Sequence, residues 1–449
     1  MKKLISVCLA AVLTLAVLLL PAPLDACAAS FQVDFELNSK SVYLKNLDTD
    51  SVVFTKEPEL RCFPASTTKI MTYIITAEHV MDLKNTRVTV KGEVLSLLNG
   101  TGSSIAGLLD GEELSVYQLL NCMMIPSGND AALILADFVG GGDIDAFVGM
   151  MNDKARELGC EGTHFVNPHG LNNTDHYTTV TDMAKITEYA MTMPMFSEIT
   201  NTATSDCLGE DRWLVTTNLM IDPVRGGDYY YEYANGIKTG STGSDSGYCL
   251  VSTATKNGYT YLCIAYGAPY PEEDEDDDDA PYVNGAMIDS KNLYEWAFDH
   301  LEIKTIINKN DLVKEIGLNF AWHKDSIQLT AAESYSTILP EDFDASDIQR
   351  TYRIPESIDA PVKAGDKVGT VSLSYKDQEL TTIDLIASEN VDKSELLIAV
   401  AGVKKVVTSQ WFILAVAVIL AVFVIYLIVV TVYSRKRKRR RPVKKYRKF

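Results

Sequence analysis

The pattern of apolar and polar positions gives residues 31–301 a texture in which helical and strand signals alternate. A buried helix is predicted over residues 66–80 by four apolar residues at helical spacing: Ile70, Met71, Ile74 and Ile75. Two apolar runs, 248–254 and 259–266, flank Lys256-Asn257-Gly258 and predict a β-hairpin. This region is therefore expected to combine helices with strands.

The texture changes at about residue 303, where short strand-like runs are separated by turn residues. Residues 360–371 predict a strand, a tight turn and a second strand, and residues 381–387 predict another strand. We therefore expect a small all-β domain over residues 303–391. No acid–base or nucleophile arrangement stands out in it. Residues 392–410 are expected to be a short juxtamembrane spacer.

The first 28 residues have the features of a signal peptide. Lys2 and Lys3 precede an apolar run, prolines end it, and Ala26-Cys27-Ala28 matches a small-x-small cleavage site. Two alternatives stay open: an uncleaved anchor helix, and a lipoprotein cleavage site at Leu24-Asp25-Ala26-Cys27. The first thirty residues are therefore expected to direct export of the chain.

Residues 411–433 contain no charge and predict a transmembrane helix. At ~1.5 Å per residue they span roughly 35 Å, enough for a hydrocarbon core of ~30 Å. Trp411 and Tyr433 stand at its two ends, where such rings favour the interface. Eleven Lys and Arg follow within residues 435–449. We therefore expect a single-pass protein of the cell membrane, with the basic tail 434–449 in the cytoplasm against lipid headgroups and the body outside.

Composition and charge exclude several classes. The chain is 47% hydrophobic and 22% charged, as an ordinary globular protein is. Residues 29–410 hold 28 Lys and Arg against 59 Asp and Glu, which argues against nucleic acid as a partner. Residues 272–279 are eight consecutive acids, expected to form a solvated surface insertion, with a cation site as the alternative.

Six cysteines remain after signal cleavage: Cys62, Cys122, Cys160, Cys207, Cys249 and Cys263. An exported chain permits disulfides, and six cysteines allow fifteen pairings. Because no C-x-x-C spacing occurs, zinc is not expected. His164, His169 and His176 are five and seven residues apart, which does not fit one helix face, so neither a metal site nor a Ser-His-Asp triad is expected.

Three short motifs carry candidate chemistry: Ser66-Thr67-Thr68-Lys69, Ser127-Gly128-Asn129 and Lys238-Thr239-Gly240. A serine at a helix start and a lysine three residues later share one face. The hydroxyl needs a base, and a lysine can serve if burial or a nearby cation such as Lys238 lowers its pKa. The N–H of Ser66 stays free to face an oxyanion.

Each motif alone has an ordinary explanation. Ser66 could be a helix N-cap, Ser127-Gly128-Asn129 a turn, and Lys238-Thr239-Gly240 an edge strand. The three in this order, each in a suitable setting, are specific. They resemble the motif set of the penicillin-binding protein and serine β-lactamase superfamily. The low-molecular-mass D-alanyl-D-alanine carboxypeptidases are most similar, through Pro64-Ala-Ser-Thr-Thr-Lys-Ile-Met-Thr, Pro126-Ser-Gly-Asn-Asp-Ala-Ala, Phe165-Val-Asn-Pro-His-Gly-Leu with His176-Tyr-Thr-Thr-Val-Thr-Asp-Met-Ala, and Gly236-Ile-Lys-Thr-Gly-Ser-Thr.

The resemblance covers about residues 35–390 and implies an α/β catalytic domain over 29–302, an antiparallel sheet with helices on both faces, followed by the all-β stalk. It also implies roles. Ser66 attacks the carbonyl between two D-alanines, Lys69 takes its proton and Ser127 passes a proton to the leaving D-alanine. The substrate is bound by Asn129 at its amide, by Lys238 and Thr239 at its carboxylate, and by the N–H groups of Ser66 and Ser241 at the oxyanion. Gly240 leaves room for a peptide along the strand edge.

The implied enzyme is a serine-type D-Ala-D-Ala carboxypeptidase that remodels peptidoglycan, needs no cofactor and is acylated by β-lactam antibiotics. One alternative is a serine β-lactamase; another is a penicillin-sensing or peptidoglycan-binding receptor without turnover. Class A β-lactamases carry Glu-x-x-Leu-Asn after the second motif, and here Pro168 stands three residues before Leu171. Since proline is no base, penicillin should be a long-lived inhibitor. Two features depart from the family pattern: a real membrane span and the acidic insertion.

Overall fold

The computed structural model describes residues 31–270, 283–376 and 378–439. The predicted signal peptide, the acidic insertion and the last ten residues of the tail lie outside these ranges. The described residues form two compact units. The first holds the chain up to Ile306 together with Tyr335–Gln349 and Leu373–Thr381, and the second holds Ile307–Ser334, Arg350–Ser372 and the chain from Thr382 onward. The units thus interleave along the sequence after residue 306, where a single boundary at 302/303 was expected.

A five-stranded sheet forms the centre of the first unit. Its strand order is β2 (Ser51–Lys56), β1 (Ser41–Asn46), β9 (Tyr259–Ala268), β8 (Tyr248–Lys256) and β7 (Ala234–Ser241). All four neighbouring pairs are antiparallel. The predicted hairpin joins β8 to β9, and both of its turn residues, Asn257 and Gly258, have positive φ. Strand β7 is left as an edge of the sheet.

Side chains alternate between the two faces of this sheet. On β9, Leu262, Ile264 and Tyr266 belong to one buried apolar cluster, whereas Tyr261, Cys263 and Ala265 belong to another. Strand β1 alternates in the same way, with Tyr43 in the first cluster and its two neighbours in the second. Successive side chains of a strand point to opposite faces, so both faces are covered.

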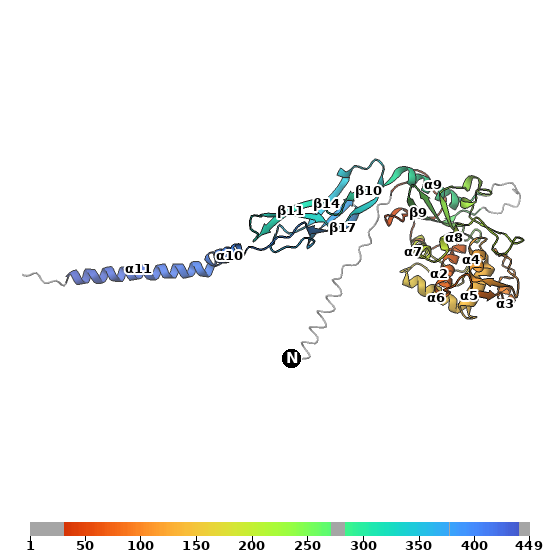
Figure 1. Cartoon of the computed structure of the whole chain (residues 1–449), viewed down its shortest axis with the longest axis horizontal. Helices are drawn as coiled ribbons and strands as arrows, with labels where there is room; N and C mark the ends of the chain where they lie inside the picture. Colours follow the sequence, from red (N-terminus) through yellow and green to blue (C-terminus); the bar gives the residue numbers. More distant parts are fainter. Residues whose placement is uncertain (1–30, 271–282, 377, 440–449) are drawn as a thin grey trace, which may run out of the picture. The chain divides into compact units, whose positions relative to one another are not determined.

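Helices cover both faces, as predicted (Figure 1). The first cluster is completed by α2 (Lys69–His79), α4 (Val116–Met124), α5 (Asn129–Val139), α6 (Ile144–Glu157) and α7 (Val180–Met191). The second is completed by α9 (Gly285–His300). Helix α9 begins at Gly285, because the Asn284 side chain caps it by accepting from the N–H of Met287.

Short elements connect these layers. They are η1 (Ala65–Thr68), β3 (Arg87–Thr89), α3 (Gly92–Leu95), η2 (Ser96–Leu98), β4 (Glu113–Ser115), α8 (Phe196–Thr200), β5 (Thr204–Ser205), β6 (Leu214–Val215), η3 (Leu219–Ile221) and η4 (Gly227–Tyr229). Strands β3 and β4 pair with each other, as do β5 and β6.

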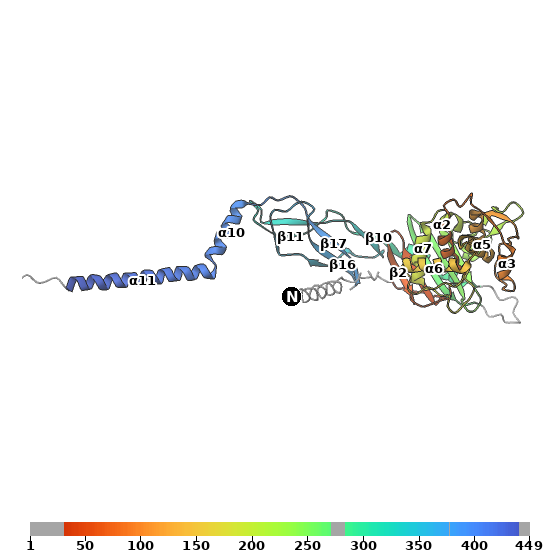
Figure 2. The same cartoon turned by 90° about the horizontal axis from the view of Figure 1, so that it is seen from below.

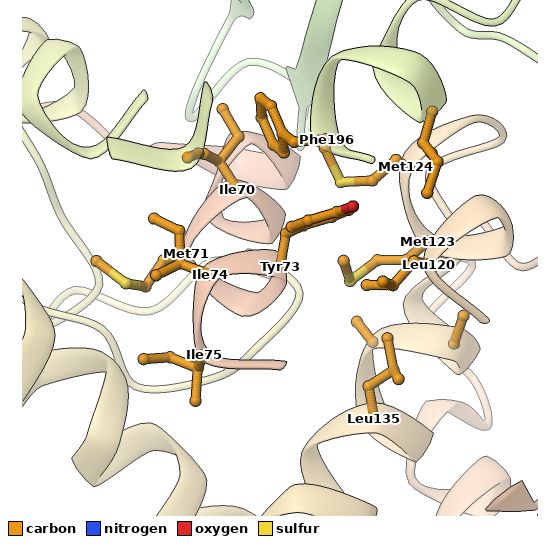
Figure 3. Packing of buried hydrophobic residues seen from close by; sticks show 14 of the residues in the cluster. Ile70, Met71, Tyr73, Ile74, Ile75, Leu120, Met123, Met124, Leu135 and Phe196 are labelled. Carbon is orange, nitrogen blue, oxygen red and sulfur yellow. The ribbon is translucent and has the colours of Figure 1, made fainter. Parts of the chain in front are cut away.

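Helix α2 is buried on all sides along Lys69–Thr76. Figure 3 shows Tyr73 pointing from α2 towards Leu120, Met123 and Phe196. The rings of Tyr73 and Phe196 meet edge to face with centroids 4.9 Å apart. A helix packed all round is held rigidly, so the residues at its first turn are fixed by the core of the domain.

Apart from the short 3-10 helix η5 (Ala345–Asp347), the C-terminal region contains only strands up to residue 387, which confirms the predicted all-β domain. Strand β10 (Leu301–Ile307) pairs with β13 (Tyr335–Pro340). A six-stranded sheet has the order β14 (Ile348–Arg353), β16 (Lys367–Tyr375), β17 (Gln378–Ala387), β12 (Ser326–Ala331), β11 (Leu312–Asn319) and β15 (Ser357–Asp359). The predicted hairpin over 360–371 is only half formed: β16 supplies its second arm, and the first contributes one isolated bridge, Val362 to Val391.

Two helices end the described chain (Figure 2). Helix α10 (Glu395–Val407) lies in the expected spacer, with the Ser394 hydroxyl capping its start and Lys404 and Lys405 in its last turn. Helix α11 (Gln410–Arg439) contains the predicted span. By length and composition, its portion Gln410–Arg435 could cross a membrane.

Candidate active site

The serine of the first motif lies in a tight turn just before α2. Thr67 closes this turn, because its N–H and its hydroxyl both donate to the carbonyl of Pro64, at 3.1 and 2.7 Å. Ala65 has φ +47°, a conformation that side chains with a Cβ rarely adopt. The turn places a half-buried Ser66 between buried neighbours, directly ahead of the helix.

Lys69 is completely buried and joins two of the motifs. Its Nζ lies 2.9 Å from Ser66 Oγ, 2.5 Å from Asn129 Oδ1 and 2.9 Å from the carbonyl oxygen of His169. Burial, and then the charge of Lys238, hold the pKa of Lys69 well below its usual range, although Asp130 acts in the opposite direction. A neutral amine has two protons, and the two carbonyl oxygens accept both. Its lone pair then faces the Ser66 hydroxyl, as a general base requires.

The loop that supplies the His169 carbonyl is tied to α2 at several points. The Thr72 hydroxyl donates to the Pro168 carbonyl at 2.6 Å. His176 accepts at Nδ1 from the N–H of Val166 and lies 2.8 Å from the Thr68 hydroxyl through Nε2. Burial lowers the pKa of His176 to about 4, so the ring is neutral and its proton is on Nε2. This histidine positions the loop.

Gly170 completes this contact. It has φ +93°, and a Cβ at this position would lie 1.8 Å from the carbonyl oxygen of Ala65. Only glycine can occupy such a position. The loop therefore runs against the back of the turn that carries Ser66.

The second motif begins with a strained backbone. Ser127 has φ +66° and is 5% exposed. The N–H of Gly128 donates to the Cys122 carbonyl at 3.0 Å, and α5 starts at Asn129, the last residue of the motif. Within the described part of the chain, the Ser127 hydroxyl makes no hydrogen bond, so it can meet a bound substrate.

The third motif lies on the edge strand β7. Lys238 is 1% exposed, and its Nζ donates to the Thr239 carbonyl at 3.1 Å. Burial lowers the pKa of Lys238 to about 7. The Thr239 hydroxyl meets the Thr217 hydroxyl at 2.5 Å. Ser241 ends the strand and is exposed.

Gly240 brings β7 against the nucleophile turn. A Cβ at Gly240 would lie 3.0 Å from the Pro64 carbonyl oxygen and 3.1 Å from both Ala65 Cβ and the Ser66 nitrogen. The sequence suggested a glycine to clear the substrate path. The structure adds that the turn itself needs the space.

A model of the D-alanyl-D-alanine carboxypeptidase family (Peptidase_S11) matches residues 27–269, more than half of the chain. The chain belongs to this family. A second model, the C-terminal domain of penicillin-binding protein 5, matches residues 301–393. The enzyme is therefore a serine-type peptidase built from a penicillin-binding-protein-like α/β catalytic domain and a C-terminal β-domain.

Named relatives agree with this assignment. The chain is 30% identical to D-alanyl-D-alanine carboxypeptidase DacF of Bacillus subtilis over 79% of its own length and 86% of the relative's. It is 29% identical to DacC of Escherichia coli over 78% and 83% of the two chains. The crystal structure of penicillin binding protein 5 from Haemophilus influenzae superposes with a TM-score of 0.63 at 23% identity, over 81% of this chain and all of that one. The last likeness supports the fold.

In this carboxypeptidase the predicted residues thus gather as follows. Ser66, Lys69 and Asn129 are joined by hydrogen bonds, and Gly240 lies against Ser66. Other contributors were missed: the His169 carbonyl, His176, Thr72, Thr217 and Asp130. His176 was considered as a metal ligand and as a member of a Ser-His-Asp triad, and neither role was expected. Within residues 31–270, 283–376 and 378–439 no group of three or more His, Cys, Asp or Glu side chains could hold a metal. The Phe165–Leu171 resemblance was the available signal for the loop that bears His169.

Proposed function

We propose that this carboxypeptidase removes the terminal D-alanine from peptidoglycan stem peptides ending in D-Ala-D-Ala, through an acyl-enzyme on Ser66. One observation carries the proposal: a fully buried Lys69 Nζ that lies 2.9 Å from Ser66 Oγ while two carbonyl oxygens accept its protons. The family membership supports the same substrate class.

In the first half-reaction Ser66 Oγ forms a bond to the carbonyl carbon between the two D-alanines, and its proton moves to Lys69 Nζ. The N–H groups of Ser66 and Ser241 stabilise the oxyanion. The C–N bond then breaks, and the proton reaches the leaving amine through Ser127. In the second half-reaction water attacks the ester, Lys69 takes the proton from water, and Ser66 leaves with its hydroxyl restored.

Lys238 and Thr239 bind the terminal carboxylate of the substrate, and Asn129 binds the amide of the acyl part. Since burial lowers the pKa of Lys238 to about 7, an arriving carboxylate favours its charged form. An internal peptide bond carries no such charge, which explains a preference for the chain end.

Penicillin acylates the same serine, and the adduct should last minutes or longer. Position 168 is a proline whose carbonyl accepts from Thr72, so this position offers no general base for the deacylating water. The penicillin ring stays attached and blocks water, whereas D-alanine departs. The family evidence supports the carboxypeptidase over the β-lactamase and the receptor.

Topology forms the second part of the proposal. The catalytic domain works outside the cytoplasmic membrane, α11 spans the bilayer, and the basic tail contacts lipid headgroups in the cytoplasm without binding nucleic acid. The apolar window Gln410–Arg435 and the eleven basic residues within 435–449 support this arrangement.

The test is mass spectrometry of a pentapeptide-bearing muropeptide incubated with the protein. We expect loss of one D-alanine with the native chain and none with Ser66→Ala. Penicillin should add its own mass to a peptide containing Ser66, and the variant should stay unlabelled. Labelling of another residue, or hydrolysis of penicillin at many turnovers per second, would contradict the proposal.

A further inference from the structure

A segment without helix or strand lies beside the second motif and is nonetheless firmly held. We name residues 104–109 the rim segment. The carbonyl of Ser104 accepts from the N–H of Asn129 at 2.9 Å. The Asp130 carboxylate, whose residue is 3% exposed, accepts from the N–H groups of Ala106, Gly107 and Leu108 at 2.9, 2.9 and 3.1 Å. Four hydrogen bonds thus join this segment to two consecutive residues of α5.

A second clamp holds the rim segment from another direction. The guanidinium of Arg212, between β5 and β6, donates to the carbonyl of Gly107 at 3.0 Å. The same group pairs with Glu112 at 2.5 Å, just beyond the rim segment. Backbone groups bonded on both sides leave little freedom for the segment, so its shape is set before a substrate arrives.

The held segment presents two apolar side chains to solvent, Leu109 at its far end and Ile105 beside the second motif. Ile105 is 58% exposed, although Ser104 and Ala106 on either side are bonded to Asn129 and Asp130. A single exposed isoleucine is ordinary on a protein surface. Ile105, however, is held rigidly next to Asn129, the residue that binds the substrate amide in the proposed function. It therefore offers a preformed contact surface for the substrate.

We propose that Ile105 is a specificity-determining residue of the carboxypeptidase, and that Asp130 is its positioning residue. Ile105 packs against the aliphatic side chain of the stem-peptide residue that precedes D-Ala-D-Ala. This proposal rests on the proposed function, which fixes the direction of the substrate. Lys238 and Thr239 bind its carboxyl end and Asn129 the amide of its acyl part, so the preceding residue leaves the site past Asn129. There the Ser104 carbonyl is bonded to Asn129 and Ile105 follows.

Two substrates separate this contact from the chemistry. One is diacetyl-L-lysyl-D-Ala-D-Ala, which has a long aliphatic side chain before D-Ala-D-Ala, and the other is acetyl-glycyl-D-Ala-D-Ala, which has none. The full-length protein in detergent is assayed for D-alanine release. Ile105→Ala should lower kcat/KM for the lysyl substrate about tenfold, the scale of a few lost apolar contacts, and leave the glycyl substrate unchanged.

Met81→Ala is the matched control, because Met81 is fully exposed and lies beyond the far end of α2 from Ser66. It should leave both substrates unaffected. Asp130→Asn should lower the ratio of kcat/KM for the lysyl substrate to kcat/KM for the glycyl substrate, as Ile105→Ala does. The asparagine NH₂ is a donor, so it cannot accept from the three N–H groups of the rim segment as the carboxylate does. Its thermal melting shows whether the variant is folded; if it is not, Ile105→Ala still decides the specificity claim.

Equal losses on the two substrates with Ile105→Ala, or no loss on either, would overturn the contact. An unchanged ratio in folded Asp130→Asn would overturn the positioning role. Failure of the proposed function looks different: the native chain would then release D-alanine from neither substrate.

Discussion

The two compact units of the chain differ in what they bury. In the first unit, charged and polar side chains are buried around the three motifs: Lys69, Ser127, Asn129, Asp130, His169, His176 and Lys238. Among the described residues of the second unit, every buried side chain is apolar, as with Ile327, Leu329 and Val371. Its ion pairs, such as Lys367 with Asp384, are half exposed.

The difference shows where the fold tolerates unfavourable interactions. Taking a charge out of water destabilises a domain unless partners compensate, and a β-domain gains nothing from it. In the catalytic unit burial lowers the pKa of both Lys69 and Lys238, and the strained backbones of Ala65 and Ser127 stand at two of the motifs. Among the described residues, buried charged side chains are therefore confined to the first unit, which carries the three motifs.

The largest expected effect is therefore on a buried lysine. Lys69→Ala should reduce D-alanine release and penicillin acylation by roughly 10²–10⁴-fold, because Ser66 would lose the base that the proposed mechanism assigns to it. Stopped assays with a labelled penicillin measure the acylation rate. Lys367→Ala removes an exposed lysine of the second unit and is the control that should change neither rate. Comparable losses of activity in Lys69→Ala and Lys367→Ala would contradict the inferred difference between the units.

The next effect is on pH dependence, with the sign set by two lysines. In the proposed mechanism Lys238 is charged when it binds the carboxylate, and burial lowers its pKa to about 7, so kcat/KM should fall as pH rises through about 7. The proposed mechanism also needs a neutral Lys69 as the base. Because a proton on Lys69 removes this base, kcat/KM should also fall when the pH is lowered through the pKa of Lys69. The two limbs belong to the coupled pair.

Lys238→Arg separates the two limbs. A guanidinium stays charged at all accessible pH values, so the alkaline limb should disappear while the acid limb remains. A full pH profile of kcat/KM for both proteins measures this. An alkaline limb that survives in Lys238→Arg would show that another group loses the proton.

The fold class and the three motifs could be predicted from the sequence, because each motif consists of neighbouring residues whose identities can be found without knowing the fold. The partners of those motifs are distant along the chain. Lys69 contacts a carbonyl 100 residues away, and no local spacing predicts such a contact. The contact of the His169 carbonyl could not be predicted either, because every residue has a backbone carbonyl and the residue type does not show which one is used. Helix α10 did leave a signal, apolar residues at 396, 400, 403 and 407, which was overlooked in a segment expected to be a spacer.

A pair of glycines sharpens the comparison at smaller scale. A Cβ at Gly369, in β16, would lie 2.5 Å from the Arg353 carbonyl oxygen, whereas one at Gly240 would lie 3.0–3.1 Å from the nucleophile turn. Gly369→Ala should lower the free energy of unfolding by about 1–3 kcal/mol and leave acylation unchanged in the folded protein. Gly240→Ala should have the opposite outcome: its main effect should be a slower acylation of Ser66, and its effect on the free energy of unfolding should be the smaller one. Thermal melts measure the stability of both variants, and penicillin labelling measures their acylation. Slower acylation in Gly369→Ala, or a loss of stability alone in Gly240→Ala, would contradict the prediction.

The smallest effect on catalysis is expected from removing the membrane helix. Truncation after residue 410 should release the protein from membranes with kcat/KM unchanged, because no motif residue lies in the second unit. Fractionation after confirmed signal cleavage, with D-alanine release measured on the soluble part, is the test. Truncated protein that stays on membranes would contradict a single anchor. Helix α10 would then be the remaining contact, since Leu396, Val400 and Val403 are exposed, and a further truncation after residue 393 should release the enzyme.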